Sequence, residues 1–201
     1  MSTHKTSSLF IFSAASGAGK TTLMNKVMPS FPNVVYSVSV TTRKPRSGEV
    51  DGVHYFFKTE EEFKEMIEKN KLVEWNKVHG NYYGTPKFFI EQKLSEGKDV
   101  VFDLDVFGKI NFDKFYPEAV GILILPPSME ELELRLRNRK TESEESLRLR
   151  MENAKKENDF ALAEGKYEHV IYNGDLEIAA AELKGIMEKY SSFKSSSQSG
   201  S

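Results

Sequence analysis

The chain has 201 residues, of which 29% are charged and 39% hydrophobic, and this ordinary globular composition excludes a disordered chain, a coiled coil or a collagen. The formal net charge of −2 gives no reason to expect affinity for nucleic acid or for a membrane surface. The sequence contains no cysteine, which excludes disulfides and thiolate metal sites, and we expect a cytoplasmic protein.

Short apolar runs alternate along the chain with segments of helical periodicity. Apolar runs bounded by polar residues are typical of strands buried on both faces of a parallel sheet. The predicted strands are residues 9–12, 100–102, 120–125 and 169–172. The predicted helices are a first helix ending at residue 28, then residues 60–70, 87–96, 130–139, 143–162 and 176–190. This alternation predicts an α/β fold with right-handed crossovers.

Three segments do not follow that alternation. Both ends of the chain are rich in serine and lack periodicity, so we predict disordered tails at 1–8 and 191–201 around one domain, 9–190. The stretch 36–55 is rich in β-branched residues and turn formers, which predicts an antiparallel lobe inserted into the core.

The segment SAASGAGKTT, residues 13–22, lies between the first predicted strand and the first predicted helix. A phosphate-binding loop belongs at this place, because the backbone N–H groups at a helix N-terminus hold phosphates. Gly17 and Gly19 let the backbone approach a phosphate, Lys20 can reach the β and γ oxygens, and Thr21 offers a hydroxyl to Mg²⁺. The alternative is an ordinary glycine-rich turn with a solvated lysine.

The carboxylate of Asp103 directly follows the predicted strand 100–102. Beside a phosphate loop, such a carboxylate can hold Mg²⁺ or the water molecules bound to it. Acidic residues at strand ends are also common caps, so the signal is weak by itself. Together with the phosphate loop it predicts a metal site made by Thr21 and Asp103.

Two further segments are candidates for binding an acceptor. Arg43 and Arg46 flank a proline turn in TTRKPRSGE, where two guanidinium groups can converge on one phosphate. The alternative is a solvated basic turn. Glu74 precedes GNYYGT, residues 80–85, and a carboxylate, a phenol and a hydroxyl there can line a small polar pocket. The alternative is an aromatic hairpin packed on the core, and periodicity does not decide between the two.

A series of arginines follows the third predicted strand, 120–125. Arg135 and Arg139 are four residues apart and share one face of the predicted helix. The polar segment 140–146 predicts a mobile loop between two helices, and therefore a lid. The alternative is a solvated helix whose charge is balanced by nearby glutamates. The other members of the series are Arg137, Arg148 and Arg150.

Taken together, these segments resemble the guanylate kinases, which make GDP from GMP and ATP. The resemblance covers about residues 9–190 and rests on TTRKPRSGE, GNYYGT, LPPSMEELELRLRNRKTESEES and VIYNGDLE. It implies a parallel-sheet P-loop kinase core, a mixed or antiparallel GMP-binding lobe over about 38–87, and a helical lid over about 137–150.

The resemblance also implies roles for individual residues. The GMP-binding positions are Ser39, Arg43, Arg46, Tyr55, Glu74, Tyr83, Thr85, Asp103 and Asp105. The ATP-binding positions are Ala14, Ala15, Ser16, Gly17, Ala18, Gly19, Lys20, Thr21, Thr22, Arg135 and Asn173. The catalytic positions are Lys20, Arg43, Arg139 and Arg150.

The chain departs from the usual pattern of the family at two places. Ala14 and Ala15 stand where the family usually has Gly-Pro, and Phe107 stands where it usually has Gln. A methyl group at the first position of the phosphate loop is harmless only where φ is negative, so we expect a negative φ at Ala14.

The implied reaction is in-line transfer of the γ-phosphoryl group of ATP, bound with Mg²⁺, to the phosphate of GMP. The GMP phosphate is already mostly a dianion at pH 7, so the reaction requires alignment and charge neutralisation rather than a general base. We expect GMP and ATP as ligands, with dGMP left open as an acceptor, and no nucleic-acid, membrane or obligate protein partner.

Two other interpretations are weighed against this one. A non-catalytic guanylate-kinase-like module that binds acidic or phosphorylated peptides would not need the phosphate loop. A related P-loop kinase that acts on a phosphorylated sugar would have no use for a base-reading carboxylate at Glu74.

Overall fold

Five parallel strands form the central sheet within residues 7–138 and 143–191, which the computed structural model describes. Their spatial order is β2-β7-β1-β8-β9, and each neighbouring pair is parallel. The strands are β1 (Leu9–Ser13), β2 (Val34–Tyr36), β7 (Asp99–Asp103), β8 (Val120–Leu125) and β9 (His169–Tyr172). The four predicted strands and the α/β class are therefore confirmed, and β2 is a fifth strand that we did not predict.

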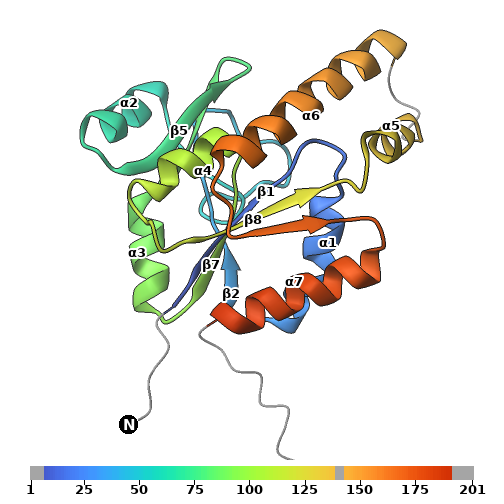
Figure 1. The fold of residues 1–201 in the computed structure, drawn as a ribbon. Coiled ribbons are helices and arrows are strands. Elements are labelled where there is room, and N and C mark those ends of the chain that lie inside the picture. The colour runs from blue at the N-terminus through green and yellow to red at the C-terminus, as the bar shows by residue number, and fades with distance from the viewer. Residues whose placement is uncertain (1–6, 139–142, 192–201) are drawn as a thin grey trace, which may run out of the picture.

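Helices cover both faces of this sheet (Figure 1). Successive side chains of a strand point to opposite faces, so β1 supplies two hydrophobic cores. One helix layer consists of α1 (Lys20–Val27), the short 3₁₀ helix Met28–Ser30 and α7 (Leu176–Tyr190), and the other of α3 (Lys87–Ser95) and α4 (Val106–Asp113). Phe10 and Phe12 pack in the core between the sheet and helices α1 and α7. Leu9 and Ile11 pack in the core on the opposite face, against helices α3 and α4.

The inserted lobe is built on a second sheet, which is mixed. The residues 36–55 alone predicted an antiparallel lobe, whereas the family resemblance implied a mixed or antiparallel one, and the mixed form is confirmed. Its strand order is β4-β3-β6-β5, in which β3 pairs in parallel with β4 and antiparallel with β6. Most of the stretch 36–55 forms irregular segments and turns, because the chain must cross over to bring β4 alongside β3 in parallel. The elements are β3 (Val40–Thr41), β4 (Phe56–Phe57), α2 (Glu60–Glu68), β5 (Leu72–Val78) and β6 (Asn81–Pro86).

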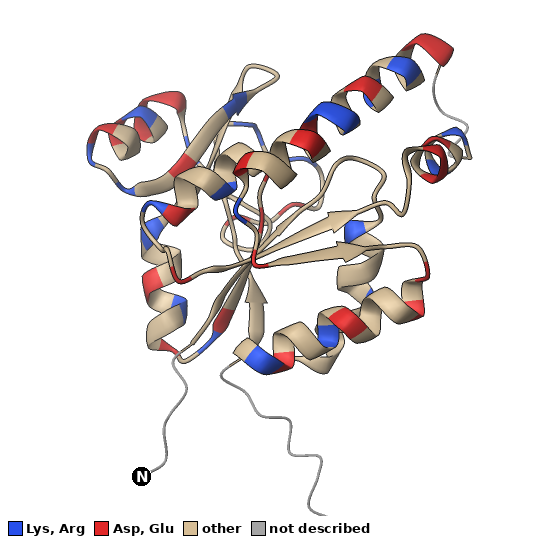
Figure 2. Ribbon diagram, viewed as in Figure 1, with Lys and Arg blue, Asp and Glu red and all other residues tan. Residues whose placement is uncertain are grey.

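Two helices, α5 (Met129–Arg137) and α6 (Glu144–Glu164), lie between β8 and β9 in the chain. Basic and acidic side chains alternate along α6 (Figure 2). Ser143 caps α6 by accepting a hydrogen bond from the N–H of Ser146. Residues 144–146, which the predicted helix 143–162 and the predicted loop 140–146 share, therefore form the first turn of α6. Residues 140–142 of the predicted loop lie outside the described residues.

The boundaries of the predicted helices are confirmed to within two residues, and α4 was not predicted. Ser8 and Ser191, which we assigned to the two tails, are hydrogen-bonded to the domain. The Ser8 N–H and the Ser191 hydroxyl donate to the two carboxylate oxygens of buried Asp99, at 2.7 and 2.6 Å. Among the described residues, no helix combines the length and the apolar character that crossing a membrane requires.

Candidate functional site

The predicted phosphate loop connects β1 to the N-terminus of α1. Gly17 and Gly19 have φ angles of 95° and 90°, a region that disfavours side chains, and a Cβ atom on Gly19 would collide with the side-chain amide of Asn173. In the described ranges, the non-glycine residues with a positive φ are Asn70, His79 and Lys166. Ala14 is not among them, so the negative φ expected there is confirmed. The loop therefore has the conformation that exposes backbone N–H groups at a helix N-terminus.

Lys20, the first residue of α1, forms an ion pair with the carboxylate of Asp103. The two meet because β1 and β7 are neighbours, with Phe12 directly opposite Asp103 in the sheet. Burial lowers the pKa of Lys20 to about 8, and the negative charge of Asp105 opposes that shift only in part. Thr21 is exposed in the first turn of the same helix.

A cavity of about 260 Å³ lies beside the loop, between Gly17, Gly19, Arg135 and Asn173. Arg135 donates through Nη2 to the backbone carbonyl of Asn173 at 2.8 Å. The side-chain amide of Asn173 donates to the carbonyl of Ala18 in the loop at 2.9 Å. Three segments that are far apart in the sequence are thus brought together at the place predicted for ATP.

A further arginine reaches the loop from α6. Arg150 donates through Nη2 to the hydroxyl of Ser16 at 2.6 Å. This contact puts a guanidinium group at the side of the loop where a bound phosphate would lie. Arg139, the other arginine predicted to act in phosphate transfer, lies outside the described residues.

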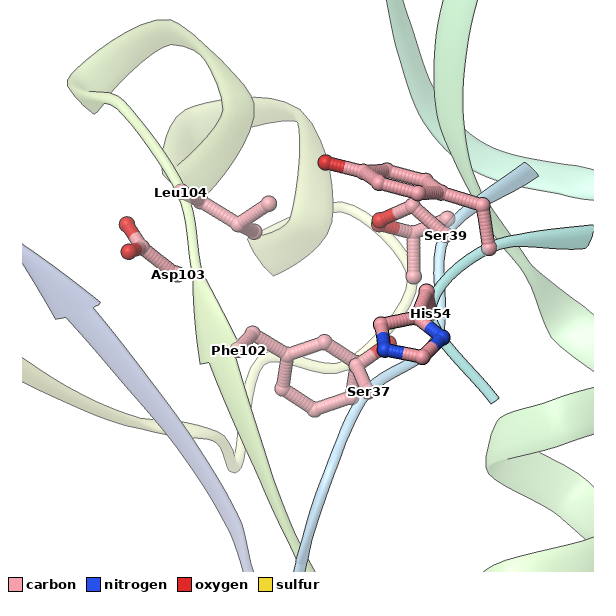
Figure 3. A pocket seen from close by; sticks show the side chains of 8 residues that line it. Ser37, Ser39, His54, Phe102, Asp103 and Leu104 are labelled. Atoms are coloured by element: carbon pink, nitrogen blue, oxygen red, sulfur yellow. The ribbon is translucent and has the colours of Figure 1, made fainter. Parts of the chain in front are cut away.

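A cavity of about 310 Å³ lies between the central sheet and the inserted lobe (Figure 3). Ser37, Ser39 and His54 stand opposite Phe102 and Leu104, at the end of β7. A second cavity of about 240 Å³ adjoins it and shares part of its wall. The predicted GMP-binding residues that line one or both cavities are Ser39, Tyr55, Glu74, Tyr83, Thr85, Asp103 and Asp105.

Glu74 lies in the β5–β6 hairpin directly opposite Thr85. The Thr85 hydroxyl donates to Oε1 of Glu74 at 2.5 Å. Burial raises the pKa of Glu74; the hydrogen bond from Thr85 opposes this shift, and the negative charge of Asp105 adds to it. The aromatic hairpin and the polar pocket, which the sequence treated as alternatives, are therefore both present.

Arg43 is held by a residue that the sequence reasoning missed. Glu49 accepts hydrogen bonds from both terminal nitrogens of Arg43, at 2.7 and 2.9 Å, and from the backbone N–H of Arg46 at 2.7 Å. These bonds lower the pKa of Glu49 to about 2 and raise the pKa of Arg43. The Arg43 guanidinium also lies 5.3 Å from the ring centre of Tyr55.

The interpretation of this segment as a simple solvated basic turn is wrong for Arg43, whose side chain is 15% exposed. The Arg46 residue is exposed, as that interpretation expected. Glu49 stands within TTRKPRSGE, and an acidic residue six positions after Arg43 was the signal that could have found it.

Two more residues of the larger cavity were not predicted. The Ser37 hydroxyl is buried and lacks a hydrogen-bond partner among the described atoms. His54 accepts a hydrogen bond from the N–H of Val50 at 3.0 Å through Nδ1. A serine on a connecting segment carries no sequence signal of such a position, whereas His54 directly precedes the predicted Tyr55.

The profile of the guanylate kinase family matches residues 6–190. A guanylate kinase of Caldanaerobacter subterraneus subsp. tengcongensis is 45% identical over 187 residues, which are 93% of this chain and 89% of that protein. A guanylate kinase of Bacillus anthracis is 46% identical over 180 residues, which are 89% and 86% of the two chains.

A solved structure is similar as well. The crystal structure of guanylate kinase from Anaplasma phagocytophilum superposes with a TM-score of 0.64 at 30% sequence identity. The superposition covers 92% of this chain and 86% of that one. The likeness in sequence and in structure thus extends over nearly the whole chain.

Proposed function

The chain belongs to the guanylate kinase family and catalyses the ATP-dependent phosphorylation of GMP, and we propose which of its side chains carry each part of that reaction. One observation supports the assignment best. Asp103 lines both cavities at the inserted lobe and also pairs with Lys20 of the phosphate loop. The cavity for the acceptor and the loop for the donor therefore share an edge, as transfer between two bound phosphates requires.

The acceptor is proposed to bind between the inserted lobe and the end of β7. Guanine presents two adjacent donors, N1–H and the 2-amino group, and the Glu74 carboxylate can accept from both. Because Thr85 donates its proton to Glu74, the hydroxyl of Ser39 is the one left to donate to the guanine carbonyl. Asp103 and Asp105 complete the wall on the side of the central sheet.

The acceptor phosphate is proposed to bind to Arg43, Arg46, Tyr55 and Tyr83. Arg43 has five N–H bonds, and Glu49 and the carbonyl of Lys44 take three of them. Of the two N–H bonds that remain, one can go to Tyr83 and the other to a phosphate oxygen. The hydrogen bond with Tyr83 adds to the effect of Glu49 in raising the pKa of Arg43. The guanidinium group is thus aimed before the acceptor arrives, which reduces the entropy lost on binding.

Transfer itself is proposed to depend on cations at the phosphate loop. The GMP phosphate is already a dianion at neutral pH, so it can attack without a general base. A pKa of about 8 leaves Lys20 mostly protonated at pH 7, and a bound polyphosphate would favour the charged form further. We assign Lys20, Arg150 and Arg139 to the charge on the transferring group, and Arg135 and Asn173 to ATP.

Mg²⁺ is proposed to arrive with ATP, where it supplies neutralisation of charge on the β and γ oxygens. The Thr21 hydroxyl and the Asp103 carboxylate are the groups that would hold it. Both are exposed oxygen groups beside the loop, which suits an ion that keeps most of its water and takes few protein ligands. In the described part of the chain, no group of three or more histidine or acidic side chains could hold a metal by itself.

We also propose that residues 38–87 act as the GMP-binding lobe and residues 137–150 as the lid of a domain that spans 9–190. We expect the enzyme to act in the cytoplasm without a nucleic-acid or obligate protein partner, and its net charge of −2 supports the first of these absences. The two alternatives have less support. A peptide-binding module has no use for Lys20 at a formed phosphate loop, and a sugar kinase has none for a half-buried Glu74 in the acceptor cavity.

The test is a measurement of ADP release with GMP, dGMP, AMP, CMP, UMP and a sugar phosphate as acceptors. We expect GMP to exceed AMP and the sugar phosphate in kcat/KM by at least about 100-fold, since mispaired buried polar groups discriminate strongly. The Lys20→Ala variant, measured in parallel, excludes activity from a contaminating kinase. Comparable rates with GMP and AMP would contradict the assignment of Glu74 to the guanine base.

A further inference from the structure

Helix α4 begins inside the acceptor site. Asp105 caps the helix by accepting a hydrogen bond from the N–H of Gly108 at 2.7 Å, and both residues line the smaller cavity. The position of α4 is therefore tied to the place where we propose that GMP binds.

The same helix holds the C-terminal end of α6 at two points. The ring of Phe107 stacks on the ring of Phe160, with centroids 4.8 Å apart and planes inclined by 27°. Lys109, which is 1% exposed, donates to the backbone carbonyl of Lys166, just beyond the end of α6, at 2.8 Å. A positive charge at that end of a helix is favourable, because the carbonyl groups there carry partial negative charge.

Phe107 is 63% exposed, although in the chain it stands between Asp105 and Gly108, which line the smaller cavity. Its neighbours on α4, Val106 and Ile110, pack in a small hydrophobic cluster that also includes Ala161 and Phe160 of α6. The aromatic ring of Phe107 lies outside the buried part of this cluster, so its main contact is the stack on α6.

The other end of α6 carries Arg150, which contacts Ser16 of the phosphate loop. Ten residues separate Arg150 from Phe160, which corresponds to about 15 Å along a helix. A tilt of α6 by about 5° around Phe160 would therefore displace Arg150 by about 1.3 Å. A displacement of that size is enough to disturb a reaction that depends on alignment.

We propose that Phe107 is a positioning residue for phosphoryl transfer, which sets the tilt of α6 through its stack on Phe160 and thereby places Arg150 at the phosphate loop. This inference rests on the proposed role of Arg150. It gives a role to an exposed aromatic side chain whose contact is with α6. It also makes α4 a mechanical link between the GMP-binding cavity and the helix that reaches toward the donor.

The first experiment compares three variants. Phe107→Ala should lower kcat about tenfold and leave the KM values for GMP and ATP within twofold, because the substrates keep their own contacts. Phe107→Tyr keeps the ring and should retain at least half of the wild-type kcat. Phe115→Ala removes another exposed aromatic residue, just after α4, and should leave kcat unchanged. A change in the KM for GMP without a change in kcat would overturn the inference.

The second experiment uses double variants to separate this inference from the role of Arg150. The loss in Phe107→Ala/Phe160→Ala should be no larger than in either single variant, because each removes the same stack. Phe107→Ala should cause no further loss of kcat in an Arg150→Ala background. Losses that multiply in either double variant would refute the inference alone, whereas full activity of Arg150→Ala would refute the role of Arg150 and this inference with it.

Discussion

Replacing Glu74 by Gln tests how the acceptor base is recognised. One carboxylate oxygen of Glu74 is already occupied by the hydroxyl of Thr85 at 2.5 Å. The remaining acceptor positions face the cavity, where the two donors of guanine would lie. Glutamine has the same size but offers one acceptor, and its NH₂ group must point either at Thr85 or at a guanine donor.

The expected effect follows from that loss of one partner. A buried donor left without an acceptor costs about 1–3 kcal/mol, which corresponds to about a 5- to 150-fold rise in the KM for GMP. The KM for ATP should change little. The preference for GMP over AMP should fall, because the carboxylate that faces the N1 lone pair of adenine is no longer charged. ADP release measured with GMP and AMP gives both quantities, and Glu91→Gln, at an exposed position of α3, is the matched control.

The pH dependence provides a second, independent test of Glu74. Burial raises the pKa of its carboxyl above the ordinary value of 4.5, so protonation begins at a higher pH than for an exposed glutamate. A protonated Glu74 no longer accepts two hydrogen bonds, and the KM for GMP should rise as the pH falls toward this raised pKa. The Glu74→Gln variant should lack that rise. The reasoning is wrong if the variant keeps a KM for GMP within twofold of the wild type, or if it shows the same acid branch.

The thermal stability of the Glu74→Gln variant shows whether a loss of GMP binding comes from the changed contact with the base or from a weakened fold. A carboxyl whose pKa is raised in the folded state binds protons more tightly when folded than when unfolded. Its contribution to stability is therefore present at low pH and is lost as the pH rises from 4.5 through the raised pKa. At pH 8, Glu74→Gln should consequently unfold at the same temperature as the wild type or at a higher one, even though it binds GMP less well. A lower unfolding temperature at pH 8 would indicate that the carboxylate supports the fold.

Three other predictions concern the phosphate contacts. Lys20→Ala should lower kcat by about 100-fold or more. In the wild type the KM for ATP should rise as the pH passes through about 8, where Lys20 is half deprotonated; a flat pH profile would contradict its place at the polyphosphate. Glu49→Gln should raise the KM for GMP about tenfold with little change in kcat, because Gln cannot hold both terminal nitrogens of Arg43; a lower KM would mean that the carboxylate competes with the substrate phosphate. Ala14→Gly should change the KM for ATP less than twofold, since Ala14 has a negative φ; a tenfold fall would show that its methyl group hinders the nucleotide.

The features of this protein that could be predicted from its sequence are local ones. The four predicted strands and the phosphate loop were found because each depends on residues that are neighbours in the chain, an apolar run or glycines at fixed spacing. The helix α4 was missed because it spans only eight residues and contains Gly108, a poor helix former. The edge strand β2 was missed because it has three residues and so shows no periodicity.

Which of these features come into contact depends on how the strands and helices pack together. The strand order β2-β7-β1-β8-β9 differs from the chain order, and it alone makes Asp103 a neighbour of Lys20. Packing between segments likewise produces the mixed sheet of the lobe. It also produces the ion pair of Arg43 with Glu49 and the stack of Phe107 on Phe160. Parallel strands and side-chain contacts pair residues that are distant in sequence, and no local pattern of hydrophobicity or charge specifies which distant partner each residue will meet.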